Sequence, residues 1–454
     1  MRELIQIVGE ENFTDTIEEL VPYSYDASVN VRRPDAVVWP DSTEQVKEIV
    51  KLANEQRIPL IPRGAGTSLS GGVIAIHGGI IIDLSRMNRI LEVNIEDRYA
   101  RVQAGVVCDD LNRVLAKYGF TFPPDPASST VATIGGNVGS NAGGIKGAKY
   151  GTTRDYVIGL QVVLPTGEVM ETGSRTMKCV SGYDLAKLFV GSEGTLGVVT
   201  EVTLKINPIP RCAMTAVATY DRLEDAGKAI SQTMTSGILP SVMEILDKAT
   251  LKSIKENTDM DLPDAEIMIL AETDGFTWEE VEAQMEVVLR ILRENGPSLI
   301  KTAKDERERV ELWEARKSAY ATLARISTSF VLDDVTVPIS KVPELLVGIQ
   351  KIARRHGLVV ATYGHAGDGN LHPQILYDEY YPEQVEKMER VEADLFRLAV
   401  SLGGTLTGEH GIGLSKANYM TLEHDPVEMA LMQRIKRTVD PNNIMNPGKM
   451  SLEN

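Results

Sequence analysis

Two glycine-rich segments near the C-terminus hold residues whose types and spacing suit metal-assisted chemistry. His365 and His372 stand seven positions apart in HAGDGNLH, where the glycines allow a turn that brings both imidazoles to one point. Glu409 and His410 follow in GEHG and add a carboxylate and a third imidazole. Two imidazoles and a carboxylate that leave coordination positions open are typical of a catalytic divalent ion, and zinc, manganese and iron(II) would all accept them. We therefore predict a divalent metal centre in this part of the chain.

Two more glycine-rich segments, nearer the N-terminus, suit the binding of a diphosphate. The first, RGAGTSLSGG, begins at Arg63 and offers backbone N–H groups together with the hydroxyls of Thr67 and Ser68, which is the composition of an anion-binding nest. The second, residues 121–151, is also rich in Gly, Ser and Asn. The first loop lacks the third glycine of a Rossmann fingerprint, and the chain has no GKS or GKT, so neither a Rossmann site nor a P-loop is expected.

The elements that must position the first pair of loops are short strands and one clear helix. Apolar periodicity and a candidate N-cap predict a helix over residues 42–55. Residues 121–151 are expected to be loop-rich, because three prolines open the segment. Strands are predicted over residues 36–40, 58–61, 79–84, 99–104, 157–164, 168–171 and 198–206.

The histidine segments belong to a stretch of different character, which begins after two prolines at 208 and 210. Strands and longer amphipathic helices alternate there, as in an α+β domain whose sheet is covered by helices. The strands are predicted over 213–219, 242–246, 266–271, 330–337 and 358–363, and the helices over 223–235, 279–294, 306–326, 342–356, 382–402 and 427–438.

Composition excludes several classes of function. The 454 residues carry a formal charge of −17, from 47 Lys and Arg against 64 Asp and Glu, which suits neither a nucleic-acid backbone nor an anionic membrane surface. No stretch approaches the roughly 18 apolar residues of a membrane span, and the acidic start resembles neither a signal nor a transit peptide. The three cysteines form no CxxC pair, which argues against a four-cysteine iron–sulfur cluster and favours a reducing, cytoplasmic location.

These motifs, taken in order, resemble a known family along essentially the whole chain. The chain is similar to flavoproteins with the vanillyl-alcohol-oxidase (PCMH-type) FAD-binding domain, in the branch of glycolate oxidase subunits and D-lactate dehydrogenases. The resemblance implies an α+β fold: a two-part FAD-binding domain over 1–209, a ferredoxin-like α+β substrate (cap) domain over 210–410, and a C-terminal helical segment over 411–454. The motifs that carry it are PRGAGTSLSGG, PPDPASS, TIGGNVGSNAGG, GSEGTLGVVTEVTLK, HAGDGNLHP, GEHGIG and NPGK.

The resemblance also implies the FAD contacts. Relatives with covalent flavin carry a histidine directly after the glycine pair of the first loop, where this chain has Thr67 and Ser68, so noncovalent FAD is expected. The implied contacts are Arg63, Gly64, Ala65, Gly66, Thr67, Ser68, Pro124, Ser128, Gly135, Gly136, Ser140, Asn141 and Gly143, joined near the adenine or flavin ring by Gly194, Val198 and Asn446.

The same resemblance assigns roles to the histidine segments. It implies that His365, His372 and Glu409 bind a divalent metal (zinc, manganese or iron), and that His410 is the catalytic base. Arg316, on the helix predicted over 306–326, matches the family's carboxylate-binding arginine, whose fork geometry suits a bidentate ion pair. A small D-2-hydroxy acid would then chelate the metal, lose its hydroxyl proton and pass a hydride to FAD.

The substrate and the electron acceptor are inferred with alternatives. Relatives that act on dicarboxylates place a lysine early in the strand where this chain reads Val331-Leu332-Asp333. We therefore favour a monocarboxylate, D-lactate before glycolate, over D-2-hydroxyglutarate. Since the chain lacks a cysteine cluster and a haem motif, electrons are expected to pass to a partner, either an electron-transferring flavoprotein or an iron–sulfur subunit. That partner could hold the chain at a membrane. Transfer to O₂ ranks lower, and a homo-oligomer is left open.

Two other functions are compatible with the same resemblance. The FAD fold also serves an ether-lipid synthase and phenol oxidases, and some relatives are flavin electron-transfer or assembly subunits without catalysis. The presence of both HAGDGNLH and GEHG, together with Arg316, argues for hydroxy-acid oxidation over either alternative.

Overall fold

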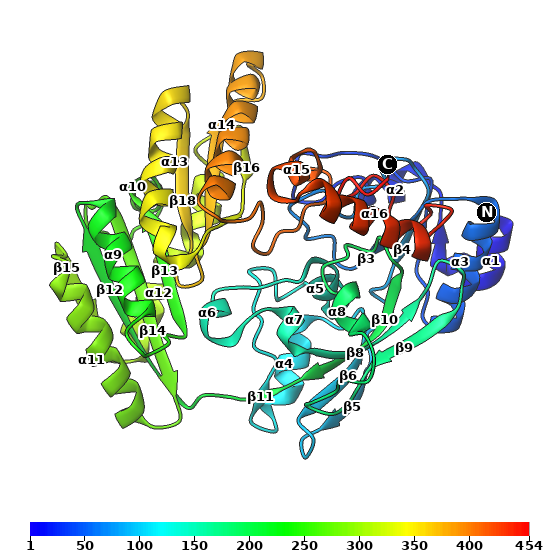
Figure 1. Ribbon diagram of the computed structural model, residues 1–454, viewed down its shortest axis with the longest axis horizontal. Coiled ribbons are helices and arrows are strands. Elements are labelled where there is room, and N and C mark those ends of the chain that lie inside the picture. The colour runs from blue at the N-terminus through cyan, green and yellow to red at the C-terminus, as the bar shows by residue number, and fades with distance from the viewer. Residues whose placement is uncertain (454) are drawn as a thin grey trace. The chain divides into compact units, whose positions relative to one another are not determined.

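The computed structural model describes residues 1–453, which divide into two compact units. The first unit comprises Met1–Gly144, Gly151–Ile209 and the segment from Glu409 onward. The second comprises Ile145–Tyr150 and Pro210–Gly408. Each unit is therefore built from pieces that are distant in the sequence. In Figure 1 the C-terminal segment of the first unit, in red, lies among its N-terminal elements, in blue.

The first unit contains two larger sheets and a two-stranded one. In one, β2 pairs in parallel with β4, which pairs in parallel with β3, and β1 adds an antiparallel edge. The other sheet is antiparallel in the order β5-β6-β10-β8-β9. The strands are β1 (Phe13–Thr14), β2 (Ala36–Val38), β3 (Leu60–Arg63), β4 (Ile80–Asp83), β5 (Ile90–Asn94), β6 (Tyr99–Gln103), β8 (Val157–Val163), β9 (Val169–Gly173) and β10 (Val198–Lys205), with β7 (Phe120–Thr121) pairing β11 (Asn207–Pro208).

Helices close the cores beneath these sheets. The Ser42 hydroxyl caps α3 by accepting the backbone N–H of Gln45, and its buried stripe Val46, Ile49, Val50 and Ala53 joins the core under β2, β3 and β4. The helices are α1 (Arg2–Val8), α2 (Ile17–Leu20), α3 (Thr43–Gln56), α4 (Cys108–Ala116), α5 (Ile134–Ser140), α7 (Thr153–Tyr156), α8 (Leu185–Phe189), α15 (Met420–Glu423) and α16 (Pro426–Val439).

Two helices, α5 and α6 (Gly147–Tyr150), form inside the segment 121–151 that is predicted to be loop-rich. Helix α5 forms inside this segment, and the Thr133 side chain caps it by accepting the N–H of Gly136 at 3.1 Å. Its buried residues Ile134, Asn137 and Val138 face the unit's interior. Glycine has a low intrinsic helix propensity, so this helix depends on its cap and on tertiary packing.

The second unit is a single antiparallel sheet covered by helices. Its order is β15-β12-β14-β13-β18-β19-β16, and β17 also pairs with β19. The strands are β12 (Cys212–Tyr220), β13 (Val242–Asp247), β14 (Ile267–Gly275), β15 (Leu299–Thr302), β16 (Ser329–Leu332), β17 (Val335–Thr336), β18 (Val359–His365) and β19 (Asn370–Tyr377). The helices are α6 (Gly147–Tyr150), α9 (Leu223–Met234), α10 (Lys248–Asn257), α11 (Trp278–Glu294), α12 (Glu306–Leu323), α13 (Val342–His356) and α14 (Pro382–Ser401).

Two helix layers flank this sheet. Helices α10 and α12 pack on one face over Val217, Leu246 and Leu270, whereas α9, α11 and α13 pack together on the other. The predicted strand 330–337 is split into β16 and β17: its pairing with β19 stops after Leu332 and resumes at Val335. The α+β class is confirmed in both units.

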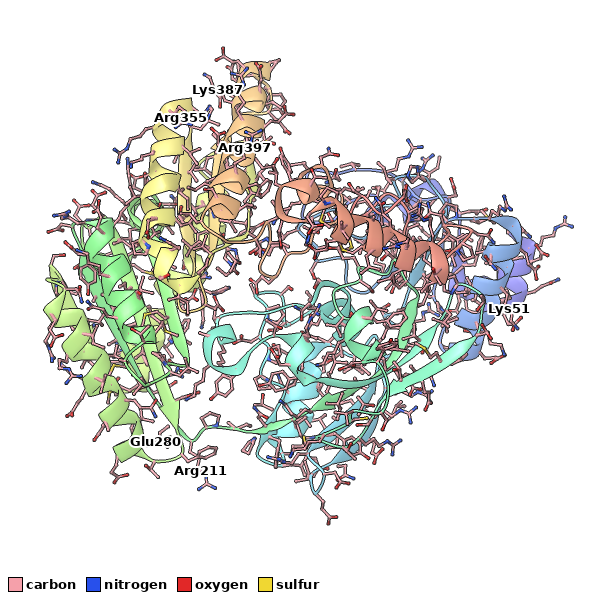
Figure 2. All side chains as sticks on the ribbon, viewed as in Figure 1. Lys51, Arg211, Glu280, Arg355, Lys387 and Arg397 are labelled. Carbon is pink, nitrogen blue, oxygen red and sulfur yellow. The ribbon has the colours of Figure 1, made fainter. Side chains whose placement is uncertain are left out.

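The outer surfaces of the helices are charged (Figure 2). Lys51 on α3 lies 2.8 Å from Glu48, and Arg397 on α14 lies 3.2 Å from Asp394. Within residues 1–453, no helix has the length and apolar character needed to cross a bilayer.

Candidate active site

The hairpin of β18 and β19 brings the two histidines of HAGDGNLH together. His365 pairs with Asn370 across the strands, Tyr363 pairs with His372, and the chain reverses through Gly369 with φ +83°. Both imidazoles are buried, and their ring centroids lie 4.9 Å apart. The turn expected from the glycines therefore exists and places the two histidines at one point of the second unit.

A buried glutamate on the neighbouring strand joins one of these histidines to the predicted substrate arginine. Glu244, on β13, is 0 % exposed. Its Oε1 lies 2.5 Å from His365 Nδ1, and its Oε2 accepts a hydrogen bond from Arg316 Nε. The Arg316 guanidinium also lies over the Tyr363 ring, 5.0 Å from its centroid. Burial raises the pKa of the Glu244 carboxyl, but the charges of His365 and Arg316 outweigh it and lower that pKa to about 2.

A second buried carboxylate stands behind the other histidine. Asp334 Oδ1 lies 3.7 Å from His372 Nδ1 and accepts a hydrogen bond from Asn370 Nδ2 at 2.5 Å. Its Oδ2 accepts from Thr407 Oγ1 at 2.6 Å and from the backbone N–H of Gly408 at 2.9 Å. Asp334 therefore fixes the end of the second unit immediately before Glu409.

The donor chemistry around the histidines fits a divalent metal. An ionised Glu244 can only accept a hydrogen bond, so His365 Nδ1 must carry a proton, which leaves Nε2 as the nitrogen that could bind a metal. The carboxylate of Asp334 also faces the Nδ1 side of His372. Carboxylates behind histidines are a common feature of metal sites, where they fix the tautomer and raise the basicity of the ligand. The hydrogen bond to Glu244 thus orients His365 Nε2 toward a potential ligand, whereas Asp334 lies 3.7 Å from His372 Nδ1, beyond hydrogen-bond distance.

The first unit anchors the segment that begins at Glu409. Ser70 Oγ, in the first glycine-rich loop, donates to the carbonyl oxygen of His410 at 3.1 Å. The Glu193 carboxylate accepts the backbone N–H groups of Ile412 at 2.6 Å and Gly413 at 2.8 Å. The GEHGIG segment is therefore fixed on the glycine-rich loops by its backbone.

The glycine-rich loops of the first unit fit a diphosphate. Among the described residues, no group accepts a hydrogen bond from the backbone N–H groups of residues 65–69. A Cβ on Gly64 would lie 2.2 Å from Thr133 Oγ1, so this loop passes against the N-terminal cap of α5. Unused N–H donors beside a close backbone approach are what an anion such as the FAD diphosphate requires.

Asn446 connects the first glycine-rich loop to the GSEG segment. Its Nδ2 donates to the carbonyl oxygens of Gly72 at 2.8 Å and Glu193 at 2.6 Å. Gly194 has φ +71° and contacts Pro62, at the end of β3. The predicted contacts on loop 64–72, on α5 and around Gly194 are therefore brought together in one unit.

Other predicted FAD contacts have visible structural tasks. The Arg63 guanidinium donates to the carbonyl oxygens of Pro22 and Tyr25 at 3.3 Å and so braces the loop from behind. Asn141, with φ +54°, accepts from Thr152 Oγ1 and the Arg154 N–H. The remaining members are placed as follows: Val198 is a core residue of β10, Pro124 is buried, Ser140 donates to the Gly136 carbonyl, and Ser128 lies in the turn before Ala132.

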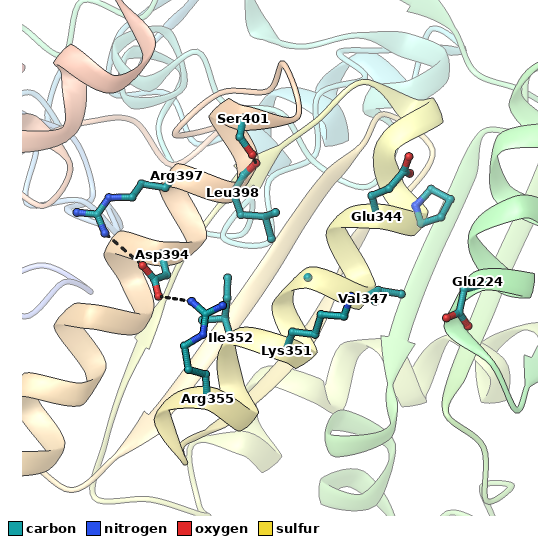
Figure 3. Close-up of a pocket in the computed structure, with 12 residues that line it drawn as sticks. Glu224, Glu344, Val347, Lys351, Ile352, Arg355, Asp394, Arg397, Leu398 and Ser401 are labelled. Atoms are coloured by element: carbon teal, nitrogen blue, oxygen red, sulfur yellow. Dashed lines mark hydrogen bonds and ion pairs between the residues drawn. The ribbon is translucent and has the colours of Figure 1, made fainter.

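A groove of about 680 Å³ in the second unit does not carry this chemistry. It lies between α9, α13 and α14, and Figure 3 shows Asp394 between Arg355 and Arg397 at its rim. The rest of its lining mixes aliphatic residues such as Val347 and Leu398 with charged ones such as Lys351. No histidine lines it, so the groove offers no counterpart to the His365 and His372 pair.

Sequence reasoning missed the three carboxylates that organise these segments. Glu244 sits within an otherwise apolar strand, and that interruption is the one sequence signal for it. Asp334 lies in a predicted strand without an assigned role. Glu193 lies in the GSEG motif, where the predicted FAD contact is Gly194. Each acts through contacts to residues more than 30 positions away, which spacing alone does not reveal.

Comparison with protein families agrees with this arrangement. The sequence model described as "FAD linked oxidases, C-terminal domain" matches residues 209–450, and the one described as "FAD binding domain" matches residues 34–173. Together they cover the second unit and both N-terminal glycine-rich segments.

Individual proteins are also similar to the chain, two in sequence and one in fold. The chain is 42 % identical to the glycolate oxidase subunit GlcD of Bacillus subtilis (strain 168), over 99 % of this chain and 96 % of that protein. It is 37 % identical to the mitochondrial D-lactate dehydrogenase [cytochrome] of Arabidopsis thaliana, over 98 % of this chain and 79 % of that protein. A solved structure of p-cresol methylhydroxylase with substrate bound is similar in fold, with a TM-score of 0.81 at 20 % identity, covering 99 % and 95 % of the two chains.

Proposed function

The chain belongs to the family of FAD-linked oxidases, and on that basis we propose that it is a dehydrogenase of small D-2-hydroxy acids. D-lactate is the favoured substrate and glycolate is the next. One observation carries the proposal: Glu244 holds Arg316, the proposed substrate-binding cation, beside His365, a proposed metal ligand. The names of the relatives, glycolate oxidase subunit and D-lactate dehydrogenase, support the same class of substrate.

The residues of the chain divide the work. Arg316 binds the substrate carboxylate through its terminal Nη groups, because its Nε is already engaged by Glu244. His365, His372 and Glu409 would hold a divalent metal, which supplies Lewis acidity to the substrate hydroxyl when bound. His410 accepts the hydroxyl proton as general base, a role typically worth about 10²–10⁴-fold in rate.

The first unit supplies the redox cofactor site. Noncovalently bound FAD would supply the hydride acceptor for the substrate Cα. Loop 64–72 would hold the diphosphate through its N–H groups, together with the segment from Gly135 to Gly143. The proposed domain limits remain 1–209, 210–410 and 411–454, with the last segment completing the FAD site through Asn446.

Reduced flavin must pass its electrons onward, and we propose that a partner protein receives them. The Bacillus subtilis relative is named as a subunit, which supports a multi-subunit assembly containing an iron–sulfur subunit or an electron-transferring flavoprotein. The three cysteines are all free, which supports a reducing, cytoplasmic location, either in solution or at a membrane through the partner.

Anaerobic flavin spectra test this proposal directly. Purified holoprotein is mixed in separate cuvettes with D-lactate, L-lactate, glycolate and D-2-hydroxyglutarate. Bleaching of the bound flavin by D-lactate and not by L-lactate is the expected result. Bleaching by D-2-hydroxyglutarate alone would replace the favoured substrate with a dicarboxylate. A bound flavin that none of the four acids reduces would favour a non-catalytic electron-transfer subunit.

A further inference from the structure

Glu244 is a buried charge in a fully buried strand of the sheet. It lies in the middle of β13, between Met243 and Ile245, and all six residues of this strand are buried. Removing a carboxylate from water costs several kcal/mol unless well-placed partners compensate it. Both oxygens are compensated, one by His365 Nδ1 and the other by Arg316 Nε. We therefore look for the role of Glu244 in the two side chains that it holds, His365 and Arg316.

Its two partners serve different ligands in the proposed function. The bond to His365 sets the tautomer, so that Nε2 is the metal-binding atom. The bond to Arg316 occupies the Nε edge of the guanidinium while Tyr363 covers one of its faces, with 5.0 Å to the ring centroid. The Nη groups then remain as the end that can meet a substrate carboxylate. One carboxylate thus orients a metal ligand and a substrate cation together.

We infer that Glu244 is a positioning residue that couples metal binding at His365 to substrate-carboxylate binding at Arg316. This inference rests on the proposed function and deepens it. His365 and Arg316 share the negative charge of Glu244. The loss of either side chain therefore changes the strength of the interaction between Glu244 and the other. Replacing Glu244 by glutamine weakens both interactions. Removing the Arg316 charge leaves the carboxylate to His365 alone and takes a cation away from the metal site, so metal binds more tightly.

A matched control exists on the same sheet. Glu272, on β14, is also buried, and its Oε2 accepts hydrogen bonds from Arg309 Nη1 and Trp313 Nε1 on α12, both at 3.0 Å. Thr215 Oγ1 donates to the same oxygen at 2.6 Å. Glu272 therefore binds the helix that carries Arg316, with no histidine among these partners. Glu272→Gln measures the effect of losing a buried glutamate while the contacts of Glu244 to His365 and Arg316 remain.

The experiment measures Mn²⁺ affinity and substrate affinity separately on the FAD-loaded protein. Metal is removed by dialysis, Mn²⁺ is titrated back, and free Mn²⁺ is followed by electron paramagnetic resonance. The KM for D-lactate is then determined at saturating Mn²⁺. For Glu244→Gln we expect the Mn²⁺ dissociation constant to rise about 10–100-fold, as for other residues behind metal-binding histidines, and KM to rise as well. Glu272→Gln leaves the Mn²⁺ dissociation constant unchanged.

The outcomes separate the inference from the proposed function. An unchanged Mn²⁺ affinity in Glu244→Gln overturns the inference, and so does a weakened affinity with an unchanged KM. If Glu244→Gln does not fold, Arg316→Met decides: tighter Mn²⁺ binding supports the coupling, and equal or weaker binding overturns it. If the unmodified protein binds no Mn²⁺ and its flavin resists every hydroxy acid, the proposed function fails and takes the inference with it.

Discussion

Glu193 accepts a hydrogen bond from the backbone N–H of Ile412, with 2.6 Å between Oε1 and the nitrogen. The two residues are 219 positions apart in the sequence. The same carboxylate also accepts the N–H of Gly413, so one side chain of the glycine-rich motif GSEG fixes the backbone that follows the proposed base, His410. The backbone of Glu193 itself has φ +51°, which is uncommon for a residue other than glycine.

Glu193→Gln tests whether this anchor matters for catalysis. An amide keeps one acceptor oxygen and turns an NH₂ group toward a backbone donor, so one charge-assisted hydrogen bond worth about 1.5–3 kcal/mol is lost. We expect flavin to stay bound and its reduction by D-lactate to slow at least about tenfold. Stopped-flow absorbance measures the rate. Glu201→Gln is the control, since Glu201 pairs with Arg101 on β6. An unchanged rate in the Glu193 variant would refute the anchoring role.

His410→Ala separates proton transfer from cofactor binding. The loss of a general base is expected to slow flavin reduction by D-lactate about 10²–10⁴-fold, while the flavin spectrum in the absence of substrate stays unchanged. His424→Ala serves as control, because His424 lies 3.1 Å from Glu428 on α16 and has no proposed role. Reduction at the normal rate in His410→Ala would remove this histidine from the mechanism.

Metal removal tests the proposed ligands together. Protein treated with a chelator and then dialysed should keep its flavin but lose reduction by D-lactate, because the substrate hydroxyl is no longer acidified. Added Mn²⁺ or Zn²⁺ should restore the rate in the unmodified protein and not in His372→Ala. Full activity of the metal-free protein would show that the two histidines serve another purpose.

Gly369→Ala probes the turn that brings the histidines together. This glycine has φ +83°, and a Cβ there would lie 2.0 Å from the carbonyl oxygen of Val337. Gly357, which ends α13 with φ +68°, has open space around the same position. We expect Gly357→Ala to cost about 1–2 kcal/mol through backbone conformation alone, and Gly369→Ala to cost more. Denaturant unfolding gives both values, and equal costs would mean that the turn relaxes without penalty.

Asp247 makes stability depend on pH in a defined direction. Burial raises the pKa of its carboxyl to about 6, against the partly compensating hydrogen bonds from Thr250. Since the folded state holds this proton more tightly than the unfolded state, the residue favours folding at low pH, and that contribution is lost as pH rises from about 4 to about 6. The difference corresponds to about 3 kcal/mol.

Asp247→Asn isolates this contribution. Asparagine can still accept the N–H of Thr250 and cap α10, and it carries no titrating group. The free energy of unfolding of the variant should therefore gain relative to the unmodified protein as pH rises from about 4 to about 6, and level off above that range. Parallel curves for the two proteins across that range would contradict the assignment.

The sequence predicted the α+β class, most strands and the approach of His365 to His372, because these features depend on local patterns. Glycines permit the hairpin turn, and apolar periodicity marks the helices. Helix α5 was missed because its stability comes from the Thr133 cap and packing rather than from propensity. Strand β19 was missed because all eight of its residues are buried, and the polar ones among them, His372 and Gln374, hide the apolar pattern. The carboxylates Glu244, Asp334 and Glu193 act across long sequence separations, which only the folded chain displays.

The first unit is built from segments near both ends of the chain. This affects how the chain folds during its synthesis. Strand β3 is bordered by residues near the end of the chain: the Leu60 N–H donates to the carbonyl oxygen of Ile444, and the Asn446 N–H donates to that of Leu60, each at 2.7 Å. Domains usually fold as units during synthesis, the N-terminal one first. Here the unit that starts first is finished last, after translation of the complete second unit. Nascent chains stalled before residue 444 should expose the edge of β3, and chaperone binding to such chains is the expected signature.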